Sequence, residues 1–156
     1  GLRLIQRQFP QVQSLRDADL HMLKTIGWEM PPEVALRCKY VIEENARVGF
    51  VADALQRGEI KAVGECLYAT HAGLQHDYAV SCAELDFLVD LTRSLEYVAG
   101  ARLMGGGFGG CTLNLVKHIF LDEFEAHLKN GYERSFGITP HFYPVKISDG
   151  GSIVKS

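Results

Sequence analysis

The sequence predicts an α+β domain: a helical N-terminal part followed by an antiparallel or mixed sheet of about four strands. In the first hundred residues, apolar side chains recur every three to four positions, as in amphipathic helices. The remainder contains short β-rich runs separated by glycine-rich turns. Because most helices precede the strands instead of alternating with them, the order favours α+β over a doubly wound architecture.

Four helices are expected first. They cover residues 14–27, 31–58, 60–73 and 81–100. Ser14 and Asp17 resemble an N-terminal cap for the first helix, and Ser81 with Glu84 forms a capping box for the fourth. A glycine closes each helix.

Strands dominate the second half. They are expected at residues 101–104, 111–116, 141–148 and 152–155. A helix between the second and third strands is predicted from Phe120, Phe124 and Leu128, which are four residues apart. Pro144 lacks a backbone N–H, so the third strand should lie at an edge or contain a bulge.

Composition limits the classes of function. The chain has 156 residues, 47% of them hydrophobic and 22% charged, and a formal net charge of −3. That size suits one domain, and the slight acidity argues against nucleic acid or an anionic membrane surface as a partner. No apolar run approaches the roughly 20 residues that span a bilayer. The four dispersed cysteines lack a C-x-x-C pair and are expected to be free thiols in the cytoplasm.

The most informative segment is a glycine loop between the first two predicted strands. It consists of Gly105, Gly106, Gly107, Phe108, Gly109 and Gly110. Its spacing matches G-x-G-x-x-G, but a strand follows where a dinucleotide site needs a helix, and no G-K-[ST] follows as in a P-loop. Two interpretations remain open. The glycines either permit close packing, or they expose backbone N–H groups to an anionic ligand.

Polar residues elsewhere indicate no further site. His71 and His76 are five residues apart, which does not suit a helical metal site, and both are expected to be solvated or capping. Asp86 and Asp90 share one helical face, which we expect to be solvated. Ser81 lacks the glycine elbow of a nucleophile.

Several segments resemble a known family. Residues 100–112 are similar to the third motif of the GHMP sugar and metabolite kinases, in its galactokinase form. Residues 70–74 and 78–86 resemble that form's S-H-x-S-L and D-Y-E-V-S-C-P-E-L-D segments, and residues 14–17 and 148–150 fit at the expected places. Met104 departs from the pattern, since many members have Thr there.

The resemblance implies a ferredoxin-like C-terminal domain over residues 1–156, with the N-terminal catalytic half absent. Joined to that half, it implies phosphorylation of the C1 hydroxyl of galactose by ATP, with Mg²⁺. Loop Gly105–Gly110 would line the cleft, and the missing half would supply the catalytic residues. We therefore expect no catalytic residue and no metal site in these 156 residues, and no activity from them alone. Gly1, in place of an initiator Met, leads us to expect a chain cut from a longer one.

Two alternatives stay open. One is another GHMP sugar kinase, such as an N-acetylgalactosamine kinase. The other is a stand-alone ferredoxin-like module that binds a ligand without catalysis. An exposed apolar patch beside the glycine loop, or self-association that covers it, would favour a domain that normally packs against a missing half.

Overall fold

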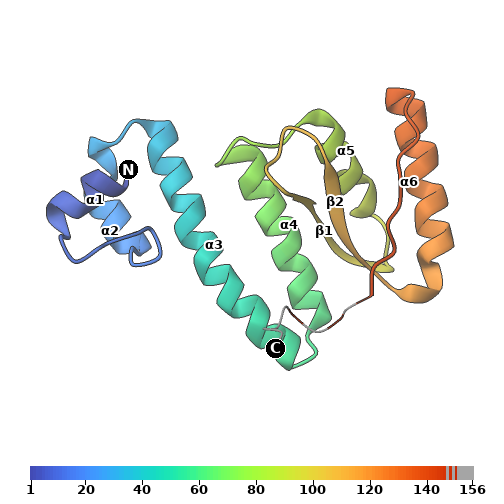
Figure 1. Ribbon diagram of the computed structural model, residues 1–156, viewed down its shortest axis with the longest axis horizontal. Helices are drawn as coiled ribbons and strands as arrows, with labels where there is room; N and C mark the ends of the chain where they lie inside the picture. The colour runs from blue at the N-terminus through green and yellow to red at the C-terminus, as the bar shows by residue number, and fades with distance from the viewer. Residues whose placement is uncertain (147, 149, 151–156) are drawn as a thin grey trace, which may run out of the picture.

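The computed structural model describes residues 1–146, 148 and 150 (Figure 1). Their regular secondary structure consists of helices and one two-stranded antiparallel sheet. The helices are α1 (Leu2–Gln8), α2 (Leu20–Ile26), α3 (Pro32–Gln56), α4 (Ile60–His76), α5 (Ala83–Thr92) and α6 (Leu121–Phe136). The strands are β1 (Val98–Met104) and β2 (Cys111–Val116), and two single 3₁₀ turns occupy Gly27–Glu29 and His118–Phe120. No helix in the described part is both long and apolar enough to cross a membrane.

The predicted start of the first helix is wrong. Asp17 accepts hydrogen bonds from the amides of Gln13 (3.0 Å) and Ser14 (2.8 Å), which fold residues 13–17 into a turn. Helix α2 begins at Leu20 instead, because Asp19 caps it by accepting from the Met22 amide at 2.7 Å. Helix α1 was not predicted.

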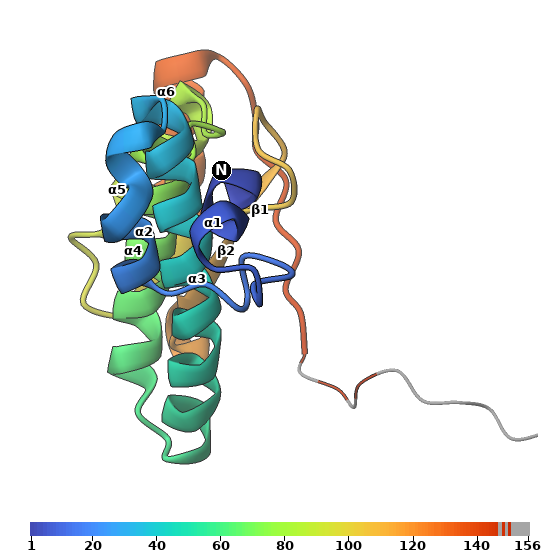
Figure 2. The ribbon, with the colours of Figure 1, turned by 90° about the vertical axis from the view of Figure 1, so that its left-hand side faces the viewer.

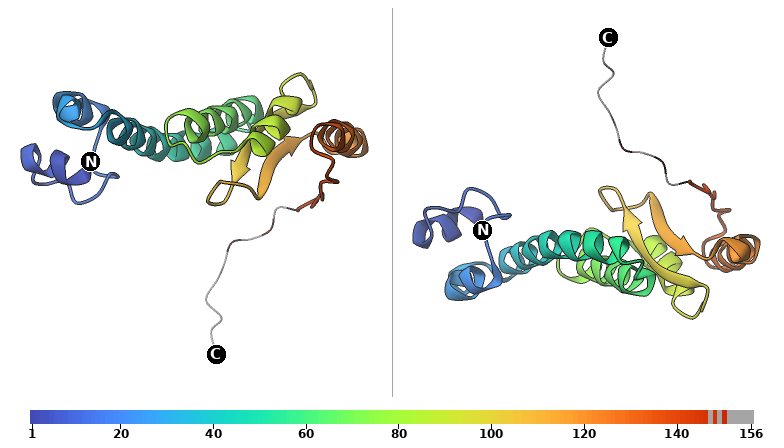
Figure 3. Two further views of the ribbon diagram at one scale, coloured as in Figure 1. Left: turned by 90° about the horizontal axis from the view of Figure 1, so that it is seen from above. Right: turned by 90° about the horizontal axis from the view of Figure 1, so that it is seen from below.

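Helices α3 and α4 confirm two predicted helices and lie side by side (Figures 1 and 3). Gly58, at φ +70°, turns the chain between them. Two polar contacts join the helices along their length. Lys39 pairs with Asp77 at 2.9 Å, and the Thr70 hydroxyl donates to Glu44 at 2.9 Å.

The strands pair with Met104 opposite Cys111 and Leu103 opposite Thr112. Helices α4 and α5 cover one face of this hairpin, and no helix of the described part covers the other (Figure 3). Strand β1 lies directly on α4, where a Cβ on Gly64 would come within 1.9 Å of the Ala99 carbonyl oxygen. Backbone therefore packs against backbone at this crossing.

Two of the four expected strands are observed. Residues 141–146 and 148 form no strand, and the expected strand at 152–155 lies outside the described residues. Pro140 and Pro144 cannot donate to a ladder, and Tyr143 and Val145 are exposed. The described residues of this segment run along the hairpin side of the molecule and pair with no described strand (Figure 2).

The capping box predicted for the fourth helix is also wrong. The N-terminal cap position of α5 is Cys82, and the Ser81 hydroxyl bonds to Asp86 instead of to the helix backbone. Helix α5 ends at Thr92, so the apolar residue Leu95 lies in the turn that leads into β1.

Most buried apolar residues of the described part of the chain fall into three clusters. The first joins α1, α2 and the start of α3; the second joins α3, α4, α5 and β1; the third joins β1 and α6. Figure 1 shows the consequence: an elongated molecule with α1 and α2 at one end and α6 at the other.

Candidate functional site

The glycine loop connects β1 to β2 as a hairpin, as the sequence predicted. Its residues are exposed or half-buried. Most of it has left-handed backbone: φ is +90° at Gly105, +83° at Gly107, +60° at Phe108, +131° at Gly109 and +101° at Gly110. Residues other than glycine rarely adopt these φ angles, so backbone conformation alone explains four of the five glycines in the loop.

Close packing is a second reason for glycine at position 107. A Cβ on Gly107 would come within 2.0 Å of the Val80 carbonyl oxygen. The same carbonyl accepts a 2.7 Å hydrogen bond from the Phe108 amide, so the middle of the loop rests on the segment between α4 and α5. At this position the packing interpretation is correct.

Gly106 has neither explanation. Its φ lies outside the left-handed range, and a Cβ built on it would meet no atom within 4 Å. The backbone here is exposed to solvent, and no contact inside the chain requires a glycine. A residue without a side chain at this position would admit close approach of a group from outside the chain.

Apolar side chains border the loop. The Phe108 ring is 76% exposed, Met104 is 45% exposed and Leu113 is 38% exposed. Leu113 and Cys111 lie on the same side of β2, and Cys111 is paired with Met104. Phe108, Met104 and Leu113 thus form an exposed apolar surface beside the loop, which we call the apolar margin. It lies on and next to the face of the hairpin that no described helix covers.

A polar cluster supports the loop from behind. The Asp86 carboxylate accepts hydrogen bonds from Gln75 Nε2 (2.8 Å) and from the Ser81 hydroxyl, and His71 Nε2 lies 3.3 Å from it. His71 Nδ1 accepts from the Leu103 amide at 3.2 Å.

The structure corrects the expectations for His71 and Asp86. Only 1% of His71 is exposed, so it is not a solvated or capping histidine. Its burial lowers the pKa of the imidazole below its usual value, and the neighbouring Asp86 carboxylate partly opposes that shift. Asp90 and His76 are exposed as expected, whereas Asp86 faces this cluster instead of a solvated surface.

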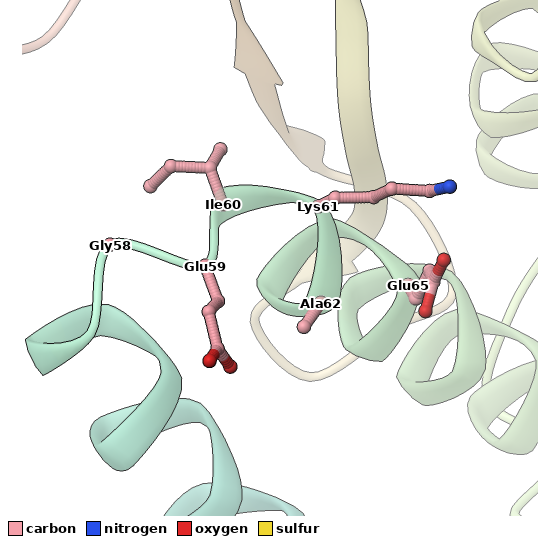
Figure 4. A pocket seen from close by; sticks show the side chains of 6 residues that line it. All are labelled: Gly58, Glu59, Ile60, Lys61, Ala62 and Glu65. Atoms are coloured by element: carbon pink, nitrogen blue, oxygen red, sulfur yellow. The ribbon is translucent and has the colours of Figure 1, made fainter.

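A hollow lies at the opposite end of α4 from the loop. It has about 570 Å³ at the turn between α3 and α4, and Gly58, Glu59, Ile60, Lys61, Ala62 and Glu65 line it (Figure 4). It flanks the N-terminal end of α4, whereas the glycine loop rests just beyond the C-terminal end. Its lining side chains are mostly exposed and present no buried polar group, so it carries no candidate site.

A known protein family matches the part of the chain that contains the glycine loop. The family model described as "GHMP kinases C terminal" matches residues 51–127, which include the glycine loop and its supporting segment. The chain belongs to the GHMP kinase family, as its C-terminal part.

Its curated relatives include proteins named galactokinase. The one from Roseiflexus sp. (strain RS-1) is 36% identical over 150 residues, covering 96% of this chain and 38% of the relative. The one from Thermosipho africanus is 41% identical over 119 residues, covering 76% of this chain and 34% of the relative. The crystal structure of Lactococcus lactis galactokinase complexed with galactose superposes with a TM-score of 0.82 and 31% identity, over 90% of this chain and 37% of that one. The chain thus spans little more than a third of these proteins.

Proposed function

We propose that this chain is the C-terminal domain, over residues 1–156, of a galactokinase that transfers a phosphoryl group from ATP to the C1 hydroxyl of galactose. The names and lengths of the relatives support this, since each matched protein extends well beyond the aligned region. The four free cysteines suit a cytoplasmic protein.

The observation that carries the proposal is the bare backbone of the glycine loop. Gly106 is open to solvent without an internal cause, and its neighbours hold left-handed angles that turn successive peptides in different directions. Such a loop can present N–H groups to the oxygens of a phosphate chain. Its dipoles would favour the charge that develops in phosphoryl transfer once the site is closed to water.

The chain supplies one wall of the site. Among the described residues, no three or more His, Cys, Asp or Glu side chains gather into a group that could hold a metal ion. We expect the residues that bind Mg²⁺ and orient the sugar hydroxyl to belong to the remainder of the protein.

The apolar margin favours a domain that packs against that remainder over a stand-alone module. Phe108, Met104 and Leu113 are exposed beside the loop, where the missing-half interpretation expects an apolar patch. Without the remainder, the same patch could be covered by self-association.

The test measures galactose-dependent formation of ADP from ATP. The protein expressed from the complete reading frame should turn over galactose, and the 156-residue chain alone should not. Turnover by the chain alone, or none by the complete protein, would contradict the proposal. Faster turnover of N-acetylgalactosamine than of galactose would assign the other sugar kinase.

A substitution in the loop tests its role in the complete protein. Gly106→Val leaves the fold intact because a Cβ meets no neighbour, but it should reduce kcat at least about tenfold by blocking close approach of the phosphates. Gly49→Val is the matched control, since Gly49 lies in α3 with equal space around it. Equal activity of the two variants would remove the loop from the site.

A further inference from the structure

The Asp86 cluster (Asp86, Ser81, Gln75 and His71) connects three parts of the chain. Gln75 and His71 lie on α4, Asp86 lies on α5, and Ser81 lies in the segment between the helices. Gln75 and Ser81 donate to the carboxylate, and His71 Nε2 lies beside it. The carboxylate thus fixes the segment between α4 and α5 against both helices.

The glycine loop rests on that segment. The Val80 amide donates to the Leu74 carbonyl at the end of α4 (3.0 Å), and the Val80 carbonyl accepts from the Phe108 amide (2.7 Å). The Val80 carbonyl belongs to the peptide bond between Val80 and Ser81. The Ser81–Asp86 hydrogen bond therefore fixes the peptide group that binds the loop.

The cluster reaches the loop by a second route. His71 Nδ1 accepts from the Leu103 amide, two residues before Gly105. Since Nδ1 accepts, Nε2 carries the imidazole proton. Nε2 lies 3.3 Å from Asp86 Oδ1 without forming a hydrogen bond, so the contact between the two side chains is electrostatic. One carboxylate therefore acts on the loop at its entry, through His71, and at its middle, through Val80.

Backbone strain marks the same place. In the described part of the chain, the non-glycine residues with positive φ are Ala79 (+58°) and Phe108 (+60°). They lie on the two sides of the Val80–Phe108 hydrogen bond. Strained conformations of this kind persist only where surrounding contacts fix them, and they gather at functional sites.

We infer that Asp86, Ser81 and His71 are positioning residues: they set the place of the glycine loop for phosphoryl transfer without touching the substrate. The inference rests on the proposed function for its catalytic consequence, whereas its geometric part, control of the loop by the cluster, does not.

The test uses the complete protein and two readouts. Hydrogen exchange, resolved to the Phe108 amide, reports the place of the loop, and steady-state kinetics report the reaction. Asp86→Asn replaces an acceptor oxygen by an NH₂ group that cannot accept from its present donors. Ser81→Ala removes the hydroxyl. Both should accelerate Phe108 exchange about tenfold and lower kcat about tenfold, with the KM for galactose changed less than about twofold.

Two variants are controls. Asp90→Asn removes a carboxylate from the exposed face of α5, one helical turn further on, and should leave exchange and kcat at wild-type values. Ser81→Thr retains a hydroxyl and should restore both readouts to within about threefold of wild type. A loss caused only by general destabilisation would affect amides throughout the sheet, not Phe108 in particular.

Each remaining result counts against the inference. Unchanged Phe108 exchange in Asp86→Asn and Ser81→Ala would show that the cluster does not hold the loop. Faster exchange with unchanged kcat would show that the loop's place does not matter to the reaction. Equal effects of Asp90→Asn and Asp86→Asn would assign them to the charge of α5. If the complete protein did not phosphorylate galactose, the proposed function would fail, while the exchange result would still decide the geometric part.

Discussion

At the scale of single residues, backbone contacts override intrinsic preference next to the glycine loop. Ala79 and Phe108 adopt left-handed angles although each has a Cβ. The Val80 peptide between them bonds to α4 on one side and to the loop on the other. These bonds compensate for a local cost of roughly 1 to 2 kcal/mol per left-handed residue.

Ala79→Gly should therefore stabilise the protein by about 0.5 to 1 kcal/mol, since relief of the left-handed strain exceeds the extra entropy of glycine in the unfolded chain. Ala52→Gly, at an exposed position inside α3, should instead destabilise it by about 1 kcal/mol. Urea unfolding followed by circular dichroism measures both. The same sign for the two variants would show that Ala79 is not strained.

His71 should make the stability depend on pH. Because burial lowers the pKa of His71 in the folded protein below its ordinary value of 6.5, the unfolded state takes up the proton first as the pH falls. The stabilisation is complete above that value and is lost as the pH falls below it, by at most about 1.4 kcal/mol per pH unit. The free energy of unfolding between pH 7.5 and 5.5 should fall more steeply in the wild type than in His71→Asn. Parallel profiles would contradict this.

At the scale of elements, the contact of α4 with β1 decides where the loop can be. A Cβ on Gly64 would overlap the Ala99 carbonyl, and one on Gly100 would come within 2.2 Å of the Gly64 carbonyl oxygen. The two glycines allow the backbone of β1 to pack directly against the backbone of α4, with no side chain between them. The loop that follows β1 is thereby brought to the end of α4, beside Val80.

Gly64→Ala should destabilise the protein by about 3 kcal/mol, because rigid backbone surrounds the added methyl group. The control, Gly49→Ala on the exposed face of α3, should stabilise it by about 0.5 to 1 kcal/mol through helix propensity. Thermal unfolding of the two variants gives the comparison. A small effect at Gly64 would mean that α4 and β1 can separate without loss.

The sequence predicts those elements whose signals are local. The periodicity of α3 and α4, the hairpin and the helix through Phe124 are confirmed. The incorrect predictions concern residues whose contacts are distant in sequence, or side chains for which two partners compete. Ser81 fits a capping box by spacing, but Asp86 takes its hydroxyl. The β-rich run after residue 140 has the composition of a strand but pairs with no strand in the described part of the chain. His71 was expected to be solvated because spacing says nothing about the strand that covers it.

The glycine loop was found from composition, and its support was not. Five glycines in six residues are evident from the sequence. The hydrogen bond that holds the loop is accepted by the backbone carbonyl of Val80, and no residue type predicts such a contact. Likewise, nothing in the sequence distinguishes Gly107, which packs against Val80, from Gly106, which faces open space.

At the scale of the whole molecule, long helix α3 links clusters that share few contacts. Ile26 belongs to the N-terminal cluster and Leu103 to the cluster under the sheet. Since the N-terminal cluster meets the rest of the chain mainly through α3, its helices can open without exposing the sheet.

Ile26→Ala should weaken the N-terminal cluster by about 2 to 5 kcal/mol and leave exchange of the Phe108 amide unchanged. Leu103→Ala, equally buried, should accelerate exchange throughout the hairpin. Hydrogen exchange by mass spectrometry distinguishes the two patterns. Accelerated exchange in the hairpin of the Ile26 variant would show a single cooperative unit.

Cys111 offers a practical consequence of the hairpin register. It is the exposed cysteine of the four, and it sits opposite Met104 at the mouth of the loop. A maleimide dye should therefore attach there first. If another domain docks on the apolar margin, as the proposed function requires, it should shield this thiol, so the rate of labelling can be followed as an assay of assembly.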